Sequence, residues 1–133
     1  MSRSGYTDDC DNIELYRASV ERALEGKRGQ SFLREMLAAM DAMPDKALIA
    51  GELVDADGSC CALGTVCKAR GLDADAIDYY DGEAVGGALG IARAMACEVE
   101  YMNDEGAIDN ETPQQRFHRM RRWIASQIKK QAK

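Results

Sequence analysis

The chain has 133 residues, of which 46% are hydrophobic, and this is enough to build the core of one domain. No apolar run approaches the roughly 20 residues of a membrane-spanning helix, and the N-terminal residues lack the apolar stretch of a signal peptide. These features exclude the membrane class and predict a single soluble, cytoplasmic domain over residues 1–133, with residues 1–10 loosely ordered.

Helical periodicity predicts most of the elements in the first half of the chain. Apolar residues from Ile13 to Leu24 recur at helical spacing and stop at Gly26, so a first helix is expected to end near Glu25. The stripe from Phe32 to Met43 predicts a second helix, which Pro44 ends.

The segment that follows has strand character. An apolar run near residues 47–54 meets the turn Asp55-Ala56-Asp57-Gly58, and a second short run begins at Cys60. An Asp/Gly turn between apolar runs is typical of a β-hairpin, so we expect one near residues 47–62 that leads into a helix over 62–70.

Three further helices are expected in the second half of the chain. The short segment 85–90 is rich in small residues, and 91–102 carries an apolar stripe at helical spacing. The last helix opens at Thr112 as N-cap, with Pro113 at its first position and Gln115 at the capping-box position. The predicted fold class is therefore α+β, predominantly α-helical, with five or six helices and one small β-hairpin.

The cysteines and the one histidine predict neither a disulfide nor a metal site. Five cysteines is an odd number, His118 is the only histidine, and no Cys-x-x-Cys pair occurs. The acidic stretch 72–83 departs from the EF-hand pattern, because Ile77 occupies a ligand position and Asp78 the glycine position. We expect no metal and no cofactor.

Cys61 is the candidate nucleophile of an alternative interpretation, in which the chain is a cysteine-dependent enzyme. It would lie at the start of a helix, where the macrodipole lowers the pKa of a thiol, and His118 on the final helix could act as its base. Cysteines in such apolar contexts are usually part of the core, so no catalytic residue is predicted.

Charge is distributed unevenly along the chain, whose formal net charge is -6. Residues 73–112 carry Arg93 against 11 acidic side chains, whereas residues 113–133 carry 7 bases and no acid. Blocks of opposite sign either neutralise each other or form surfaces for a charged partner. The acidic block could even imitate a nucleic-acid backbone towards a nucleic-acid-binding protein.

The basic final helix is the predicted partner-binding surface, because basic side chains surround Trp123 outside the apolar stripe. The alternative is that this face is simply solvated and has no binding role. However, an aromatic residue among arginines is typical of interface hot spots. Nucleic acid is a further possibility, although a sequence pI near 4.8 argues against it. The predicted contact residues are Arg116, Arg119, Arg122, Trp123 and Lys130.

One structural ion pair is also predicted. Helical spacing places Glu98 inside the apolar stripe of its helix and Arg121 beside the stripe of the final helix. A buried carboxylate needs a partner, so we expect these two helices to pack antiparallel and Glu98 to pair with Arg121.

A few short motifs resemble a set of small uncharacterised bacterial and phage-borne proteins. The motifs are Gly51, the Cys-Cys-Ala-Leu-Gly of residues 60–64, and Asn103-Asp104 before a Thr-initiated final helix. Those proteins carry Trp-Cys-Ala-x-Gly-Ala-Leu and a later Asn-Asp; here Cys60 replaces the Trp and Thr65 the Ala. The resemblance implies a protein borne by phages or mobile elements. We therefore expect a non-enzymatic interaction or regulatory protein that acts by binding another protein.

Overall fold

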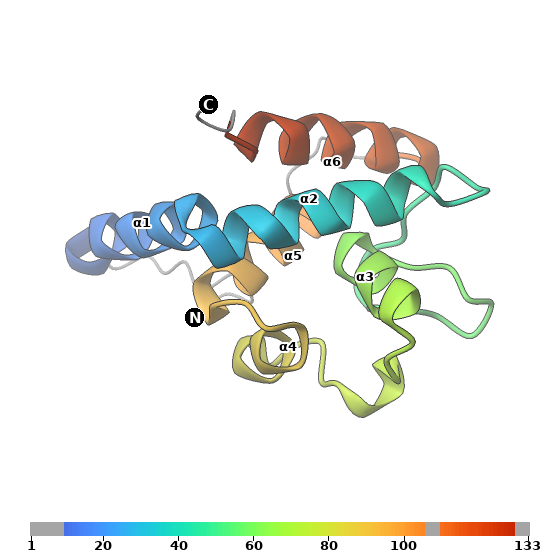
Figure 1. The fold of residues 1–133 in the computed structure, drawn as a ribbon, viewed down its shortest axis with the longest axis horizontal. Helices are drawn as coiled ribbons and strands as arrows, with labels where there is room; N and C mark the ends of the chain where they lie inside the picture. The colour runs from blue at the N-terminus through green and yellow to red at the C-terminus, as the bar shows by residue number, and fades with distance from the viewer. Residues whose placement is uncertain (1–9, 106–109, 130–133) are drawn as a thin grey trace.

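The computed structural model describes residues 10–105 and 110–129 (Figure 1). The expected loose order of residues 1–10 concerns a segment that lies, except for Cys10, outside the described residues, and so does Lys130. Six α-helices and one short 3-10 helix occupy the described ranges. Their bounds are α1 Cys10–Glu25, α2 Lys27–Asp41, α3 Ala62–Arg70, η1 Ala74–Ala76, α4 Gly82–Leu89, α5 Arg93–Glu105 and α6 Pro113–Gln127.

The predicted α+β class is wrong, because the part of the chain that the structure describes contains no β-strand. Residues 47–61 form a loop in which a single antiparallel bridge joins Val54 and Cys60. Gly51 interrupts the first run with a φ of 86°, which is incompatible with a strand. Side chains of α5 then bind the backbone there, since Asn103 donates to the Ile49 carbonyl and Asp104 accepts from the Gly51 N–H.

The loop packs directly on the first turns of α3. The Cys61 N–H donates to the Leu53 carbonyl at 3.1 Å, and Gly64 lies against that same carbonyl. A Cβ atom at Gly64 would lie 1.9 Å from the Leu53 oxygen, so only glycine fits there.

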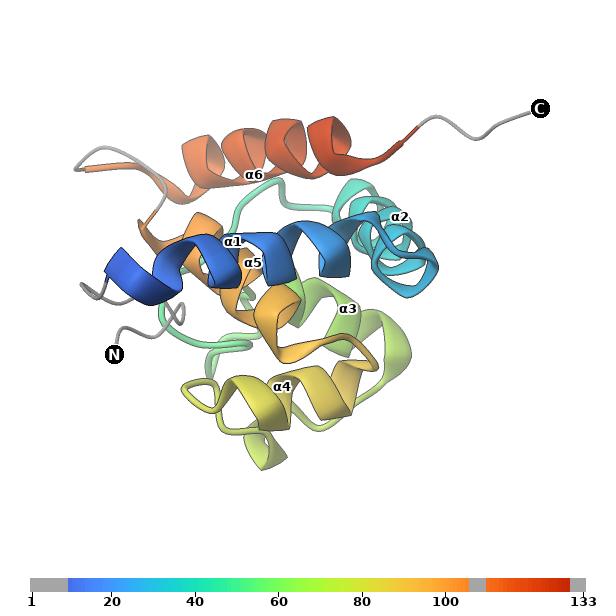
Figure 2. The same cartoon turned by 90° about the vertical axis from the view of Figure 1, so that its left-hand side faces the viewer.

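The helices surround α5, which lies between α6 at one edge of the molecule and α4 at the opposite edge (Figures 1 and 2). Helices α1 and α2 follow one another along the molecule, and α6 lies beside α2. The capping box that opens α6 is confirmed, since Thr112 and Gln115 exchange side-chain to backbone bonds of 3.1 and 2.8 Å.

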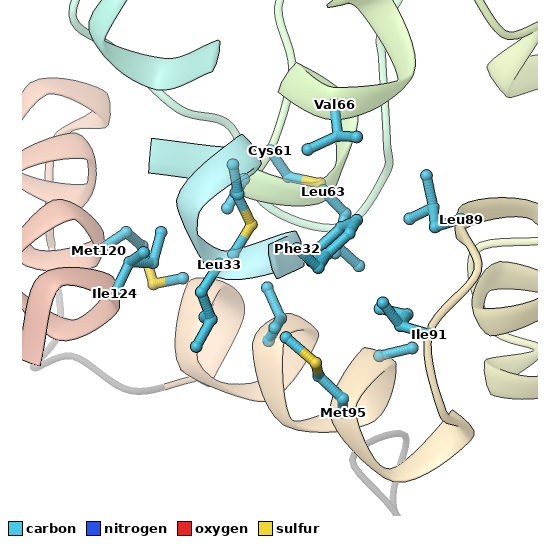
Figure 3. Packing of buried hydrophobic residues seen from close by; sticks show 14 of the residues in the cluster. Phe32, Leu33, Cys61, Leu63, Val66, Leu89, Ile91, Met95, Met120 and Ile124 are labelled. Atoms are coloured by element: carbon cyan, nitrogen blue, oxygen red, sulfur yellow. The ribbon is translucent and has the colours of Figure 1, made fainter. Parts of the chain in front are cut away.

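One buried cluster draws on every α-helix. Phe32 and Leu33 of α2 lie at its centre, with Leu63 of α3 on one side and Met120 of α6 on the other (Figure 3). The predicted stripe of α6 is buried as expected, because Phe117, Met120 and Ile124 are each at most 2% exposed. Among the described residues, no helix combines the length and the apolar character that crossing a membrane requires.

Candidate functional site

The basic face of α6 is largely used within the molecule. Arg119 is only 17% exposed at its side chain and donates to both carboxylate oxygens of Glu111, at 2.6 and 2.9 Å. It also donates to the backbone carbonyls of Met102 and Asn103 at the end of α5. The hydrogen bond from Arg119, together with the positive charges of Arg119 and Arg116, lowers the pKa of the Glu111 carboxyl, although burial opposes this.

Arg116 has a similar internal role. Its guanidinium donates to the Leu48 carbonyl at 3.0 Å, and its Nε lies 3.4 Å from Oε1 of Glu111. Arg116 and Arg119 therefore fasten the start of α6 to α5 and to the loop after α2. The prediction that both lie on an exposed contact face is not what the structure shows, because long side chains can fold back onto the protein.

The remaining predicted contact residues are divided. Arg122 is exposed, Trp123 is half-buried and packs against the core, and Lys130 lies outside the described residues. Of the predicted contact residues, only Arg122 and part of the Trp123 indole are therefore exposed on α6 within the described residues.

The ion pair expected between Glu98 and Arg121 does not form. Arg121 instead donates to both carboxylate oxygens of Asp41 at 2.7 and 3.0 Å. Glu98 is buried, and its Oε2 lies 3.4 Å from Nη1 of Arg17. The reason is the packing of α6, which lies along α2 and contacts α5 near the C-terminal end of α5. Arg121 therefore faces the end of α2.

Cys61 and His118 do not form a catalytic pair in this structure. Cys61 is 1% exposed, and burial raises the pKa of its thiol although its Sγ accepts a hydrogen bond from the Gly64 N–H. His118 is exposed and lines an open groove of about 1010 Å³ beside the end of α2. Cys60, rather than Cys61, lines that groove.

A strongly acidic surface lies between α3 and α4. We call residues 71–83 the acidic projection; they extend at the lower edge of the molecule in Figures 1 and 2. No lysine or arginine occurs between Arg70 and Arg93. The carboxylates of the projection are all exposed, and they belong to Asp73, Asp75, Asp78, Asp81 and Glu83.

The acidic projection also exposes apolar surface. Tyr80 is 65% exposed and Leu72 is 37% exposed. Within the described part of the chain, Leu15 is the only other large hydrophobic side chain with comparable exposure. An aromatic and an aliphatic side chain thus accompany the carboxylates on one short segment.

The aspartates shape the backbone of the projection. Asp73 accepts from the Asp75 N–H, Asp78 from the Tyr80 N–H, and Asp81 from two N–H groups at the start of α4. Each uses its Oδ1 atom for these bonds, in the manner of an N-cap or an Asx turn. The carboxylates of Asp73, Asp78 and Asp81 are therefore held in defined positions.

Two tyrosines fasten the projection to the rest of the molecule. Tyr79 donates its hydroxyl to Oδ2 of Asp104 at 2.7 Å, and Tyr80 donates to the Gly51 carbonyl at 3.3 Å. The Gly51 N–H donates to Oδ1 of Asp104 at 3.2 Å, so Gly51 and Asp104, the partners of the two tyrosines, are also bonded to each other. We call these four residues the tyrosine clamp. Burial raises the pKa of the Tyr79 hydroxyl, so it stays protonated as a donor.

Asn103 supports the clamp from inside. It is 1% exposed, donates to the Ile49 carbonyl and to Oδ1 of Asp104 at 2.9 and 2.8 Å, and accepts from the Ala62 N–H at 3.1 Å. Three separate motifs that were grouped by resemblance, Gly51, the segment around Ala62 and Asn103-Asp104, thus meet at one point. Sequence reasoning noted those motifs but missed Tyr79 and Tyr80, whose one signal was their position amid aspartates.

Comparisons of the chain with protein-family models, curated proteins and solved structures found no significant match.

Proposed function

We propose that this chain is a non-enzymatic interaction protein that binds a basic surface of another protein through the acidic projection. The observation that carries the proposal is the combination, on residues 71–83, of exposed carboxylates with exposed Tyr80 and Leu72. A surface that carries only negative charges steers a basic partner towards it and fixes the partner's orientation.

The apolar side chains favour a protein partner. Interfaces between proteins are enriched in tyrosine, and a few aromatic residues carry much of the binding energy. Tyr80 offers such a contact, and the tyrosine clamp holds it before the partner arrives. Binding to a preorganised surface costs less conformational entropy than binding to a mobile segment.

The solvent-facing side of α6 is the weaker candidate for the contact surface. Arg116 and Arg119 are engaged with Glu111 and with backbone carbonyls, and Arg121 is engaged with Asp41. A partner that recruited these arginines would have to break bonds that hold α6 in place.

A comparison of two charge variants in affinity capture tests the proposal. The projection variant carries Asp73→Asn, Asp75→Asn, Asp78→Asn and Asp81→Asn, and asparagine preserves the capping bonds. The control variant removes the same charge from exposed acids elsewhere, through Glu14→Gln, Glu21→Gln, Asp45→Asn and Asp57→Asn. Both variants and the wild type serve as bait in a lysate of the native host.

We expect the wild type and the control variant to recover the same basic protein and the projection variant to lose it. The affinity of the purified partner should fall with increasing salt, because screening weakens charge attraction between exposed groups. Equal recovery of the same proteins by all three baits would contradict the proposal.

A further inference from the structure

We propose that the face shared by α2 and α6 binds the phosphate backbone of a nucleic acid. Five basic side chains form this surface, which we call the α2–α6 basic face: Lys27, Arg34, Arg121, Arg122 and Lys129. Two of them belong to α2, so the face differs from the contact surface predicted on α6 alone. The proposal goes beyond the proposed function and does not involve the acidic projection.

Hydrogen bonds hold the two helices side by side and antiparallel at this face (Figure 1). Near one end, Arg34 donates to the Lys129 carbonyl at 2.8 Å, and the Lys129 N–H donates to Oε1 of Gln30 at 2.7 Å. Near the other end, Arg121 donates to Asp41, the last residue of α2, at 2.7 Å. The basic side chains of α2 and α6 therefore belong to one surface.

The helical period places the other two cations on the same surface. Lys27 and Arg34 are seven residues apart, which is close to two turns, so they share one side of α2. Arg122 lies about 100° round α6 from Arg121, on the side away from the core. Both Lys27 and Arg122 are exposed. Within the described residues, neither side chain takes part in a hydrogen bond or an ion pair.

The α2–α6 basic face keeps an excess of positive charge. Among the described residues, two carboxylates pair with it: Asp41 with Arg121 at 2.7 Å, and Glu25 with Lys129 at 3.1 Å. Five cations less two carboxylates give a formal charge of +3. All four paired side chains are at least 44% exposed, and exposed pairs are weak enough for a phosphate to compete.

The net charge of the whole chain, -6, does not prevent binding at this face. The acidic projection lies at the edge of the molecule opposite α6, with α5 between them (Figure 2). Packed helices are about 8–10 Å apart, and the Debye length at physiological salt is about 8 Å. Salt therefore screens the α2–α6 basic face from the acids of the projection.

The chemistry of the face favours a phosphate backbone over an acidic protein. Three of its five cations are arginines, whose planar guanidinium donates two parallel N–H bonds to a phosphate. The exposed large hydrophobic side chains of the described residues are Leu15, Leu72 and Tyr80, and none lies on α2 or α6. A protein interface usually depends on such apolar anchors, whereas binding to a phosphate backbone is mainly electrostatic.

Two charge variants test the proposal by fluorescence anisotropy with the full chain. The face variant carries Lys27→Gln and Arg122→Gln, and circular dichroism checks that it stays folded. The control variant removes the same charge from exposed positions on α3 and α5, through Lys68→Gln and Arg93→Gln. The probes are fluorescein-labelled single-stranded RNA and duplex DNA of about 20 nucleotides, and polyglutamate of similar charge, in about 50 mM salt.

We expect the wild type and the control variant to bind at least one of the two nucleic acids, and the face variant to bind it about 10-fold more weakly or worse. The slope of log affinity against log salt should shrink by about 2 in the face variant, about 1 for each lost phosphate contact. Whichever probe binds more tightly identifies the strand geometry that fits.

Three results would overturn the proposal. The first is that the wild type binds neither RNA nor DNA. The second is that the face and control variants lose the same affinity, because the attraction would then come from overall charge. The third is that polyglutamate binds as tightly as the nucleic acids, because the face would then not select phosphate.

Discussion

The hydroxyl of Tyr79 lies 2.7 Å from Oδ2 of Asp104, and this bond joins the acidic projection to the C-terminal end of α5. Tyr79 is 6% exposed, whereas its neighbour Tyr80 is 65% exposed. Adjacent tyrosines therefore have different roles: one anchors the segment in the protein, and the other presents a ring at the surface.

Removal of the Tyr79 hydroxyl should weaken the fold measurably. The Tyr79→Phe variant loses a buried donor to a carboxylate, a bond worth about 1.5–3 kcal/mol. Tyr80→Phe loses an exposed bond of 3.3 Å, so its effect should stay below about 0.5 kcal/mol. Urea unfolding measures both free energies, and equal losses in the two variants would show that the Asp104 bond is not the anchor.

Asn103 should be among the most sensitive polar positions of the protein. Asn103→Ala leaves the Ala62 N–H and the Ile49 carbonyl without their side-chain partner. Each buried polar group left unsatisfied costs about 1–3 kcal/mol of stability. Chemical denaturation should therefore show a loss of about 2–4 kcal/mol in the free energy of unfolding. The exposed substitution Gln114→Ala is the control, and a loss at position 103 no larger than at 114 would exclude this role.

Local signals allowed the helices to be predicted from the sequence. The capping box at Thr112, the end of α3 at Gly71 and the end of α1 near Glu25 depend on residues close in the chain, and each is confirmed. The β-hairpin failed for the opposite reason. Its Asp55 turn does form, but the backbone on one side bonds to Asn103 and Asp104, about 50 residues away.

The candidate site was harder to predict than the helices. Helical period gives the direction of each Cβ atom, but it does not say where a long guanidinium ends, and Arg119 reaches carbonyls at the end of α5. The same limit applies to Arg121, whose partner depends on which helix lies alongside. The pattern of acids between Leu72 and Glu83 was visible, but the clamp that positions it requires contacts across the fold.

Glu98 and Arg121 should behave as independent positions. They belong to separate ion pairs, with Arg17 and Asp41 respectively, so the losses of Glu98→Gln and Arg121→Met should add in the double variant. A cycle of Arg121→Met with Asp41→Asn should instead show coupling that declines with salt. Coupling between positions 98 and 121 as strong as between 41 and 121 would contradict this pairing.

The Glu111 carboxylate predicts a specific pH dependence. Its pKa is lowered in the folded protein, so its contribution to stability is present above the unfolded pKa of about 4.3 and is lost as the pH falls through the folded pKa. The stability difference between the wild type and Glu111→Gln should therefore be largest near neutral pH and shrink below pH 4. Thermal unfolding across pH 2–7 measures it, with Glu21→Gln as an exposed control. A difference independent of pH would argue against the pair with Arg119.

Photo-crosslinking from two positions tests most directly that the partner binds at the acidic projection. Tyr80→p-benzoylphenylalanine places a photoreactive group on the projection, and Trp123→p-benzoylphenylalanine places the same group on α6. After irradiation in a lysate of the native host, we predict a covalent adduct with one basic protein from position 80 and none from position 123. The same adduct from position 123, with none from position 80, would contradict the account.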